Sequence, residues 1–323
     1  MTTLEVGAPG KLFVIGEYAV LHGGRALVAA IDAGISCRVE AASTWRVAAP
    51  DLGVDGTLAE LSEEPRSALL GSAVSAACDE FRLERPLRFT VHGTRPASRR
   101  KVGLGGSAAS VVAILAAAAA AVGEDLEANE TRDRLFRCGL SVHRRHQRGR
   151  GSGADVAASV YGGWIDYAAA EGGPRVAAAS LPAGIRLAAA WSGVASDTAR
   201  ALEAFDAVGV LPRLRTILGR FWAAVDAQDR AGILSEIDAY GAALEELAGR
   251  SPGAERIAEL VRVARACGLA AKGSGAVGGD SAVAITFDPA RVPAVEKEWR
   301  ALEAEPLAVS IDTRGVRREN SHA

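Results

Sequence analysis

The chain has 323 residues, of which 49% are hydrophobic and 24% charged, and its formal net charge at pH 7 is −2. This length is sufficient for two separate cores, and the composition is typical of globular proteins. The near-neutral charge argues against nucleic acid or an anionic membrane as the main partner.

The sequence predicts neither secretion nor membrane insertion. The N-terminus lacks the basic and apolar regions of a signal peptide, and the longest apolar run, 111–122, is too short to span a bilayer. The four cysteines are widely spaced and form no C-x-x-C pair, which argues against disulfide or zinc frameworks. We therefore expect a cytoplasmic protein with reduced cysteines and no membrane partner.

The first half of the chain mixes strand and helix patterns. Branched or alternating apolar residues predict four strands, at 11–15, 26–30, 36–41 and 88–92. Helical spacing and apolar runs predict four helices, at 67–82, 108–122, 135–148 and 155–161.

A buried strand at 185–191 follows Pro182, where we place a domain boundary that gives the units 1–182 and 183–323. The remaining strands are expected at 282–287 and 307–312, and the polar tail 314–323 is expected to be frayed. Helices are expected at 195–208, 212–228, 233–247, 254–266 and 292–303. The order of strands and helices suggests an α+β second domain.

The most informative stretch is Gly103-Leu-Gly-Gly-Ser107, a glycine turn that opens directly into the apolar helix. Glycines let backbone N–H groups converge on an anion, and a helix N-terminus adds roughly half a positive charge there. The turn is not a Walker A loop, because no Gly-Lys-Ser/Thr follows, and the dinucleotide G-x-G-x-x-G spacing fails at Ala108. Taken alone, the turn fits either an anion site or a tight turn in which Ser107 caps the helix.

Two further motifs decide between these interpretations. Pro9-Gly-Lys11, Gly103-Leu-Gly-Gly-Ser-Ala-Ala109 and Lys272-Gly-Ser-Gly-Ala-Val-Gly-Gly-Asp280 resemble, in order, the three motifs of the GHMP small-molecule kinases. The resemblance spans nearly the whole chain. It implies an α+β, two-domain GHMP kinase fold: an N-terminal βα domain with a glycine-rich phosphate loop and a C-terminal ferredoxin-like α+β domain. It also implies ATP and Mg²⁺ as cofactors.

Local features resemble the phosphomevalonate kinase branch of this family. The opening at 8–20 looks like that of mevalonate and phosphomevalonate kinases, and Tyr18 stands where mevalonate kinases usually carry His. The stretches 143–162 and 191–198 resemble phosphomevalonate kinase motifs, the first of them around Asp155. The implied partners are small molecules, 5-phosphomevalonate and ATP, for a monomer or homodimer.

The resemblance implies roles for individual residues. Lys11 and Asp155 would be catalytic, and Ser107 would reach the metal. The nucleotide would be bound by the phosphate loop and a preceding lysine, namely Lys101, Gly103, Leu104, Gly105, Gly106, Ser107 and Ala108. The acceptor would be bound by Lys11, Tyr18, His143, His146, Gln147, Ser152, Gly153, Ser196, Thr198, Ser274, Gly275 and Gly278.

A basic cluster leads into the turn before Asp155, and it comprises His143, Arg144, Arg145, His146, Arg148 and Arg150. Arginine suits bidentate binding of a phosphate acceptor, although each of these residues alone also fits a solvated helix face. Three positions depart from the family pattern. Gly106 replaces the first loop serine, Arg144 stands where mevalonate kinases place a magnesium-binding Glu, and Val277 interrupts the third glycine run.

Three functions stay open from the sequence. The first is phosphorylation of 5-phosphomevalonate to 5-diphosphomevalonate in the mevalonate route to isoprenoids. The second is another GHMP kinase, such as a mevalonate kinase. The third is a catalytically silent binding protein on the same fold, against which the presence of Lys11, Ser107 and Asp155 argues.

Overall fold

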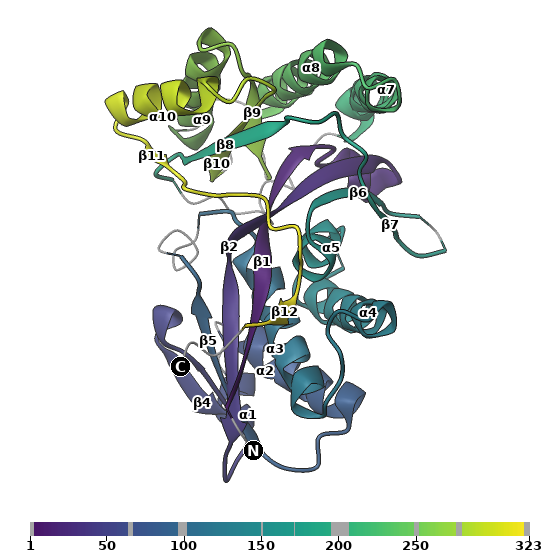
Figure 1. The fold of residues 1–323 in the computed structure, drawn as a ribbon, viewed down its shortest axis with the longest axis vertical. Helices are drawn as coiled ribbons and strands as arrows, with labels where there is room; N and C mark the ends of the chain where they lie inside the picture. Colours follow the sequence, from purple (N-terminus) through teal and green to yellow (C-terminus); the bar gives the residue numbers. More distant parts are fainter. Residues whose placement is uncertain are drawn as a thin grey trace.

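In the described part of the chain the strands form two sheets: one of eight strands, which runs through the lower and middle parts of Figure 1, and one of four strands above it. The computed structural model describes residues 3–63, 67–95, 102–149, 151–170, 172–194, 207–248, 252–275 and 280–319.

The larger sheet is built on two long strands, β1 (Leu4–Ile15) and β2 (Arg25–Ala41), in the order β12-β1-β2-β5-β3-β4, with β6 paired to β2 and β7 paired to β6. Its pairs are antiparallel except for β3 with β5. The other strands are β3 (Arg46–Ala49), β4 (Val54–Thr57), β5 (Leu87–Gly93), β6 (Trp164–Ala168), β7 (Arg175–Ala178) and β12 (Arg317–Arg318).

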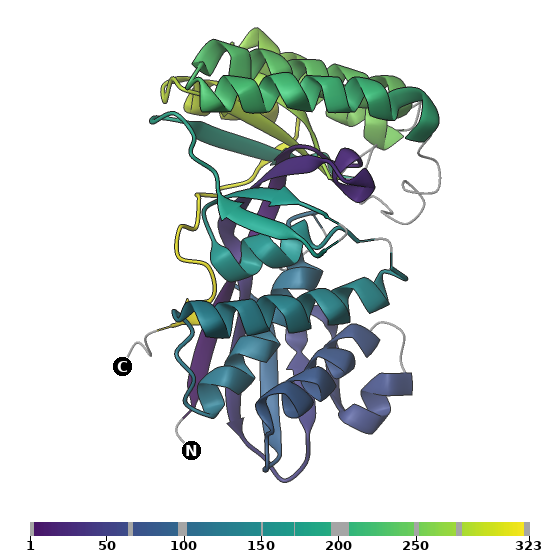
Figure 2. The ribbon, with the colours of Figure 1, turned by 90° about the vertical axis from the view of Figure 1, so that its right-hand side faces the viewer.

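Helices cover one face of this sheet (Figure 2). They are α1 (Leu58–Glu63), α2 (Ala68–Phe81), α3 (Gly106–Ala121), α4 (Asn129–His146) and α5 (Ala154–Tyr161), and the short helices η1 (Ala19–His22) and η2 (Pro50–Leu52) lie in connections. α3 contacts β1, β2, α2, α4 and α5, and its residues 108–120 are all buried. A helix that is apolar on all sides belongs inside a core, and its many alanines let the neighbouring elements approach closely.

The smaller sheet has the order β11-β8-β10-β9 and is antiparallel throughout. Its strands are β8 (Arg186–Trp191), β9 (Ala270–Ser274), β10 (Ser281–Thr286) and β11 (Glu305–Pro306). Its helices are α7 (Ala207–Asp226), α8 (Arg230–Ala248), α9 (Pro252–Ala266) and α10 (Arg291–Ala301). Helices lie between the first and second strands and between the third and fourth, which is the predicted ferredoxin-like arrangement.

The two halves share cores. One apolar cluster joins Ile15 and Leu27 of the larger sheet to Phe221 and Tyr240 of α7 and α8. Another joins Leu12, Leu104, Ala189 and Leu307, so the glycine turn before α3 is anchored between both sheets by Leu104.

The chain also returns from the second half to the first. After β11 it runs down past the larger sheet, where Ile311 bridges Ile31, and ends its described part as β12 beside β1 (Figure 1). The predicted strand at 307–312 is therefore wrong apart from that single bridge. The expectation of a frayed tail is also wrong as far as residue 319, because β12 pairs with β1.

Other boundaries differ for physical reasons. The strands predicted at 26–30 and 36–41 are one continuous strand that carries an irregularity between them: Gly10 pairs with Ile31 and Ala8 with Ile35, so the register against β1 shifts without ending the strand. α7 begins before Pro212 and carries it inside its second turn, where we expected a break. Residues 195–206 of the helix predicted at 195–208 lie outside the described ranges, and the boundary at 182/183 stays a prediction. No helix in the described part of the chain combines the length and apolarity that a membrane crossing needs.

Candidate active site

The glycine turn before α3 is seated against β1 at Gly10. A Cβ on Gly10 would lie 2.3 Å from the carbonyl oxygen of Ala33 and 2.6 Å from that of Leu104, so no other residue fits without displacing backbone. The Lys11 N–H donates to the Leu104 carbonyl at 2.8 Å. The Ser159 hydroxyl donates to the Pro9 carbonyl at 2.8 Å. The Pro9-Gly-Lys11 motif therefore serves to join strand and turn.

The side chain of Lys11 lies between the glycine turn before α3 and the third motif. Its Nζ donates to the Gly103 carbonyl at 3.0 Å, and a Cβ on Gly275 would lie 4.0 Å from the same atom. Burial lowers the pKa of Lys11, while the carboxylates of Asp155, Glu17 and Asp280 act in the opposite direction. An ammonium group placed beside the glycine turn can bridge phosphate oxygens.

The turn itself needs glycine at two positions. Gly103 and Gly105 have φ of 79° and 80°, in the left-handed region that favours glycine. A Cβ on Gly103 would also lie 2.7 Å from Asp280, which brings the third motif against the turn. Gly105 is the N-cap of α3, so the interpretation of Ser107 as the cap is wrong: Ser107 lies in the first helical turn and is exposed.

A chain of three polar side chains runs from α3 through α4 to α5. The Ser107 Oγ lies 3.1 Å from His143 Nε2, and His143 Nδ1 lies 3.6 Å from Asp155 Oδ2. Asp155 Oδ1 accepts the Val156 N–H at 2.9 Å in the first turn of α5, where the helix dipole favours a carboxylate. Only 1% of the His143 side chain is exposed, compared with 17% for Asp155.

Arg144 fixes the turn that precedes Asp155. Its guanidinium donates to the carbonyls of Gly151 at 3.2 Å and Ser152 at 3.0 Å. The Tyr167 hydroxyl, whose pKa burial raises to about 12, donates to the same Ser152 carbonyl at 2.5 Å. Arg144 thus acts on the backbone of the turn, and its neighbour His143 is the residue that faces Ser107 and Asp155.

The turn before Asp155 is held by close packing as well as by hydrogen bonds. Gly153 has φ of 90°, and a Cβ there would lie 2.1 Å from the side chain of Leu140 on α4. The Ser152 hydroxyl accepts the Ala154 N–H at 3.3 Å, so this side chain supports the start of α5. Asp155 is consequently held by a turn with little room to rearrange.

The third motif is tied to β1 by a hydroxyl and by a buried ion pair. The Ser274 Oγ accepts the Phe13 N–H at 2.9 Å and donates to the Phe13 carbonyl at 3.0 Å. The Lys272 Nζ contacts the Glu17 carboxylate and donates to the Gly273 carbonyl at 2.5 Å, and the Gly275 N–H donates to Glu17 at 3.3 Å. Lys272 is fully buried, and burial lowers its pKa.

Sequence reasoning missed the pairing of Glu17 with Lys272. The one available signal was a lysine inside the otherwise apolar, strand-like run Ala270-Ala-Lys272. A charge in a buried strand requires a partner of opposite charge, but the sequence does not say which carboxylate supplies it.

The remaining residues to which the sequence assigned a binding role are buried, lie at the end of α4, or fall outside the described ranges. Tyr18 is 3% exposed with φ of 61°, and it packs in the apolar cluster shared with α7 and α8. His146 is among the exposed residues at the end of α4. Its pKa is lowered, mainly by the part of the ring that is buried and to a smaller extent by the nearby His143. Gln147 is half-buried, with its Oε1 unpaired. The binding roles assigned to these residues stay predictions, and Lys101, Ser196, Thr198 and Gly278 lie outside the described ranges.

The oxygens of Ser107 and Asp155 are of the kind that a magnesium ion prefers. Mg²⁺ prefers hard oxygen ligands, and it is commonly held by one or two protein groups together with substrate phosphates. The exposed Ser107 hydroxyl and the partly exposed Asp155 carboxylate supply such oxygens. Across the residues described here, no three His, Cys, Asp or Glu side chains gather in a way that could hold a metal by themselves.

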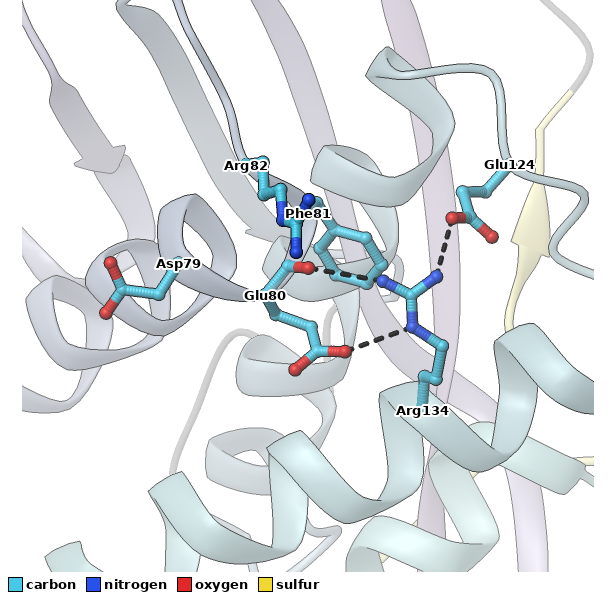
Figure 3. Close-up of a pocket in the computed structure, with 6 residues that line it drawn as sticks. All are labelled: Asp79, Glu80, Phe81, Arg82, Glu124 and Arg134. Carbon is cyan, nitrogen blue, oxygen red and sulfur yellow. Dashed lines mark hydrogen bonds and ion pairs between the residues drawn. The ribbon is translucent and has the colours of Figure 1, made fainter.

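A surface pocket elsewhere has a structural explanation. Figure 3 shows Arg134 pointing between the acidic groups of Glu80 and Glu124, beside the ring of Phe81. The Arg134 guanidinium lies 3.0 Å from the Glu80 carboxylate and 2.6 Å from that of Glu124, and it also stacks over Phe81. These ion pairs join α2 to α4 and account for the charged side chains shown, so nothing in this pocket indicates a ligand.

Comparison with known proteins places this geometry in a family. Residues 68–163 match the GHMP kinases N terminal domain, and residues 201–304 match the GHMP kinases C terminal region. The phosphomevalonate kinase of Streptomyces sp. strain CL190 is 31% identical, with 97% of this chain and 98% of that protein covered. The mevalonate kinase of Methanothermobacter thermautotrophicus is 29% identical, with 93% and 97% covered.

A solved structure extends the likeness to three dimensions. Streptococcus pneumoniae phosphomevalonate kinase in complex with phosphomevalonate and AMPPNP superimposes with a TM-score of 0.81 at 19% identity, covering 96% of this chain and 100% of that one. The expected two-domain α+β fold is confirmed.

Proposed function

The chain belongs to the GHMP kinases, and on that premise we propose that it transfers the γ-phosphoryl group of ATP to 5-phosphomevalonate to give 5-diphosphomevalonate. The observation that carries the proposal is the position of the Lys11 ammonium beside the phosphate loop, Asp155 and Gly275. We place the enzyme in the cytoplasm, as a monomer or homodimer that acts on small molecules.

Lys11 and the phosphate loop do the electrostatic part of the reaction. The N-terminus of α3 and the glycine turn bind the nucleotide phosphates through backbone N–H groups. The Lys11 ammonium then neutralises the charge between the γ-phosphate and the attacking oxygen, two anionic groups that repel each other. The γ-phosphoryl group passes in line from the β-phosphate oxygen to the acceptor, and ADP leaves.

Asp155 positions the acceptor. A phosphate monoester has a second pKa of about 6 and is already largely ionised at neutral pH, so proton removal is a minor requirement. The fixed turn before α5 holds the Asp155 carboxylate, which in turn supports the charge on Lys11. When bound, Mg²⁺ neutralises nucleotide phosphate charge, with Ser107 and Asp155 as the residues that would hold it.

Phosphomevalonate is favoured over mevalonate as the acceptor by the basic end of α4. Arg145 and Arg148 are exposed there, next to the turn that leads to Asp155. Arg144 contributes indirectly, because its guanidinium is taken up by backbone carbonyls. The relative at 31% identity is a phosphomevalonate kinase; the relative at 29%, a mevalonate kinase, supports mevalonate as the second candidate acceptor.

The test is ADP release with ATP, Mg²⁺ and a panel of 5-phosphomevalonate, mevalonate, homoserine and galactose. We expect the rate of ADP release with 5-phosphomevalonate to be at least a hundredfold above the rate with each of the other acceptors. The phosphate group of this acceptor carries charge in the transition state that Lys11 and the basic cluster bind. Turnover of mevalonate but not of its phosphate would establish the alternative. ATP binding without turnover of any acceptor would instead favour a silent binding protein.

A further inference from the structure

His143 has an arrangement that a purely structural histidine does not need. It is 1% exposed on α4, yet it contacts the exposed hydroxyl of Ser107 at the entrance to α3. Its other ring nitrogen, Nδ1, lies 3.6 Å from Asp155 Oδ2 and forms no hydrogen bond. A buried polar atom in this state costs folding free energy, so its presence calls for an explanation other than stability.

The surroundings decide which nitrogen of a neutral ring carries the proton. An ionised carboxylate can only accept hydrogen bonds, so although Nδ1 at 3.6 Å forms none with Asp155, this neighbour favours the tautomer in which Nδ1 carries the hydrogen. Nε2 is then an acceptor, and Ser107 must donate its hydroxyl proton to it. The lone pairs of the Ser107 oxygen are left for a ligand of the site. An oxygen oriented in this way suits a cation, whereas a phosphate oxygen would require a donor.

We propose that His143 is a positioning residue that presents the Ser107 oxygen, as an acceptor only, to the magnesium ion of the bound nucleotide, and that it holds this oxygen at a fixed place relative to Asp155. The proposal rests on nucleotide-dependent phosphoryl transfer as the function of the site. It is independent of which acceptor is phosphorylated. Asp155 Oδ1 is engaged by the Val156 N–H, so Oδ2 is the oxygen that lies beside His143.

Two substitutions separate the two contacts. His143→Gln places an amide oxygen near the position of Nε2, where it accepts the Ser107 proton, whereas His143→Asn reaches only the position of Nδ1. We expect Mg²⁺-dependent ADP binding to stay within threefold of the parent in His143→Gln and to weaken about tenfold in His143→Asn and His143→Ala. Binding of ADP without Mg²⁺ stays unchanged in all three. Titration calorimetry measures both affinities.

A thermodynamic cycle tests the coupling. In the Ser107→Ala background, His143→Ala is expected to cause no further loss of Mg²⁺-dependent affinity, because the oxygen that it positions is gone. His92→Gln is the matched control: His92 Nε2 bonds to Ser36 Oγ at 2.7 Å between β5 and β2, outside the residues assigned to the site. It should lower thermal stability comparably and leave both ADP affinities unchanged.

Three results would overturn the proposal. They are unchanged Mg²⁺-dependent binding in His143→Asn, equal weakening with and without Mg²⁺, and losses that multiply in the double variant. Because ADP binding needs no acceptor, failure of phosphomevalonate as substrate leaves this test intact. Should His143→Ala fail to fold, the Gln and Asn variants and Ser107→Ala carry the same comparison.

Discussion

Lys11 is a lysine whose affinity for protons is set by the groups around it. Burial lowers its pKa, Asp155, Glu17 and Asp280 counteract this, and Lys272 adds to the lowering. Bound phosphates would add several negative charges to the same small volume and raise the pKa again. The protonation of this side chain is therefore linked to occupancy of the site.

The first prediction is that nucleotide binding takes up protons at pH values between the pKa of free Lys11 and the pKa of Lys11 in the complex. Between the lowered pKa of free Lys11 and the higher pKa of the complex, the bound state carries more protons, so affinity falls as pH rises through that window. Calorimetric titration of ADP in buffers of different ionisation enthalpy measures the uptake. Lys11→Arg, whose guanidinium stays charged, should bind ADP without uptake, and an equal uptake in that variant would refute the role of Lys11.

For single residues, the sequence motifs identify which side chains belong to the site better than they identify the groups to which those side chains bond. The motifs pointed to Lys11, to the glycine turn and to Asp155, which the structure brings together. They did not reveal that the Ser274 hydroxyl bonds to the Phe13 backbone, 261 positions away. Nor did they show that Arg144 donates to carbonyls. A side chain's partner depends on which distant element packs beside it, and local spacing carries no information on that.

Among the elements, α3 illustrates a helix whose sequence was sufficient. An unbroken apolar run after a glycine turn can only be a buried helix, and residues 108–120 are indeed buried on every side. The stretch 307–312 illustrates the opposite case. Its alternating residues fit a strand, but in this segment only Ile311 forms a bridge, with Ile31 of β2. Whether an alternating segment forms a strand depends on an available edge.

The second prediction concerns the close packing around α3. Ala117 is fully buried among helices and sheet, so Ala117→Leu adds volume that has no space to occupy. It should lower the free energy of unfolding by about 1–3 kcal/mol. Urea denaturation measures the change.

Val122→Leu is the control, because Val122 is 48% exposed at the end of the same helix and should change stability by less than about 0.5 kcal/mol. Equal stability of the two variants would mean that the neighbours of α3 yield easily.

On the scale of the whole molecule, the Glu17–Lys272 pair joins the end of β1 to β9 of the other sheet. Tyr240 on α8 adds a third attachment, since its hydroxyl donates to the Glu17 carbonyl at 2.6 Å. The pair also holds the N–H of Gly275, so the join between the halves and the third glycine motif are one structure.

The third prediction is that Lys272→Met is strongly destabilising. It leaves the Glu17 carboxylate, 4% exposed, without its cation, at a cost of about 3–5 kcal/mol in the free energy of unfolding. The double variant Glu17→Gln with Lys272→Met should recover part of this loss, because no charge is then buried. Chemical denaturation measures both.

Arg300→Met provides the comparison, since its ion pair with Glu296 lies on the surface and should contribute less than about 1 kcal/mol. A similar cost for Arg300→Met and Lys272→Met would contradict the assignment of a buried, mutually dependent pair.

The short strand β12 has a consequence for folding during synthesis, because it is made long after its partner β1. Val6 of β1 pairs with Arg318, about 310 residues further along the chain, which is a very distant contact for two adjacent strands. While the intervening chain emerges from the ribosome, this side of β1 has backbone groups without a strand beside them, and such open edges promote association between nascent chains. Two residues of β12, anchored by Arg318 to the Ala120 carbonyl, close that edge at the end of folding.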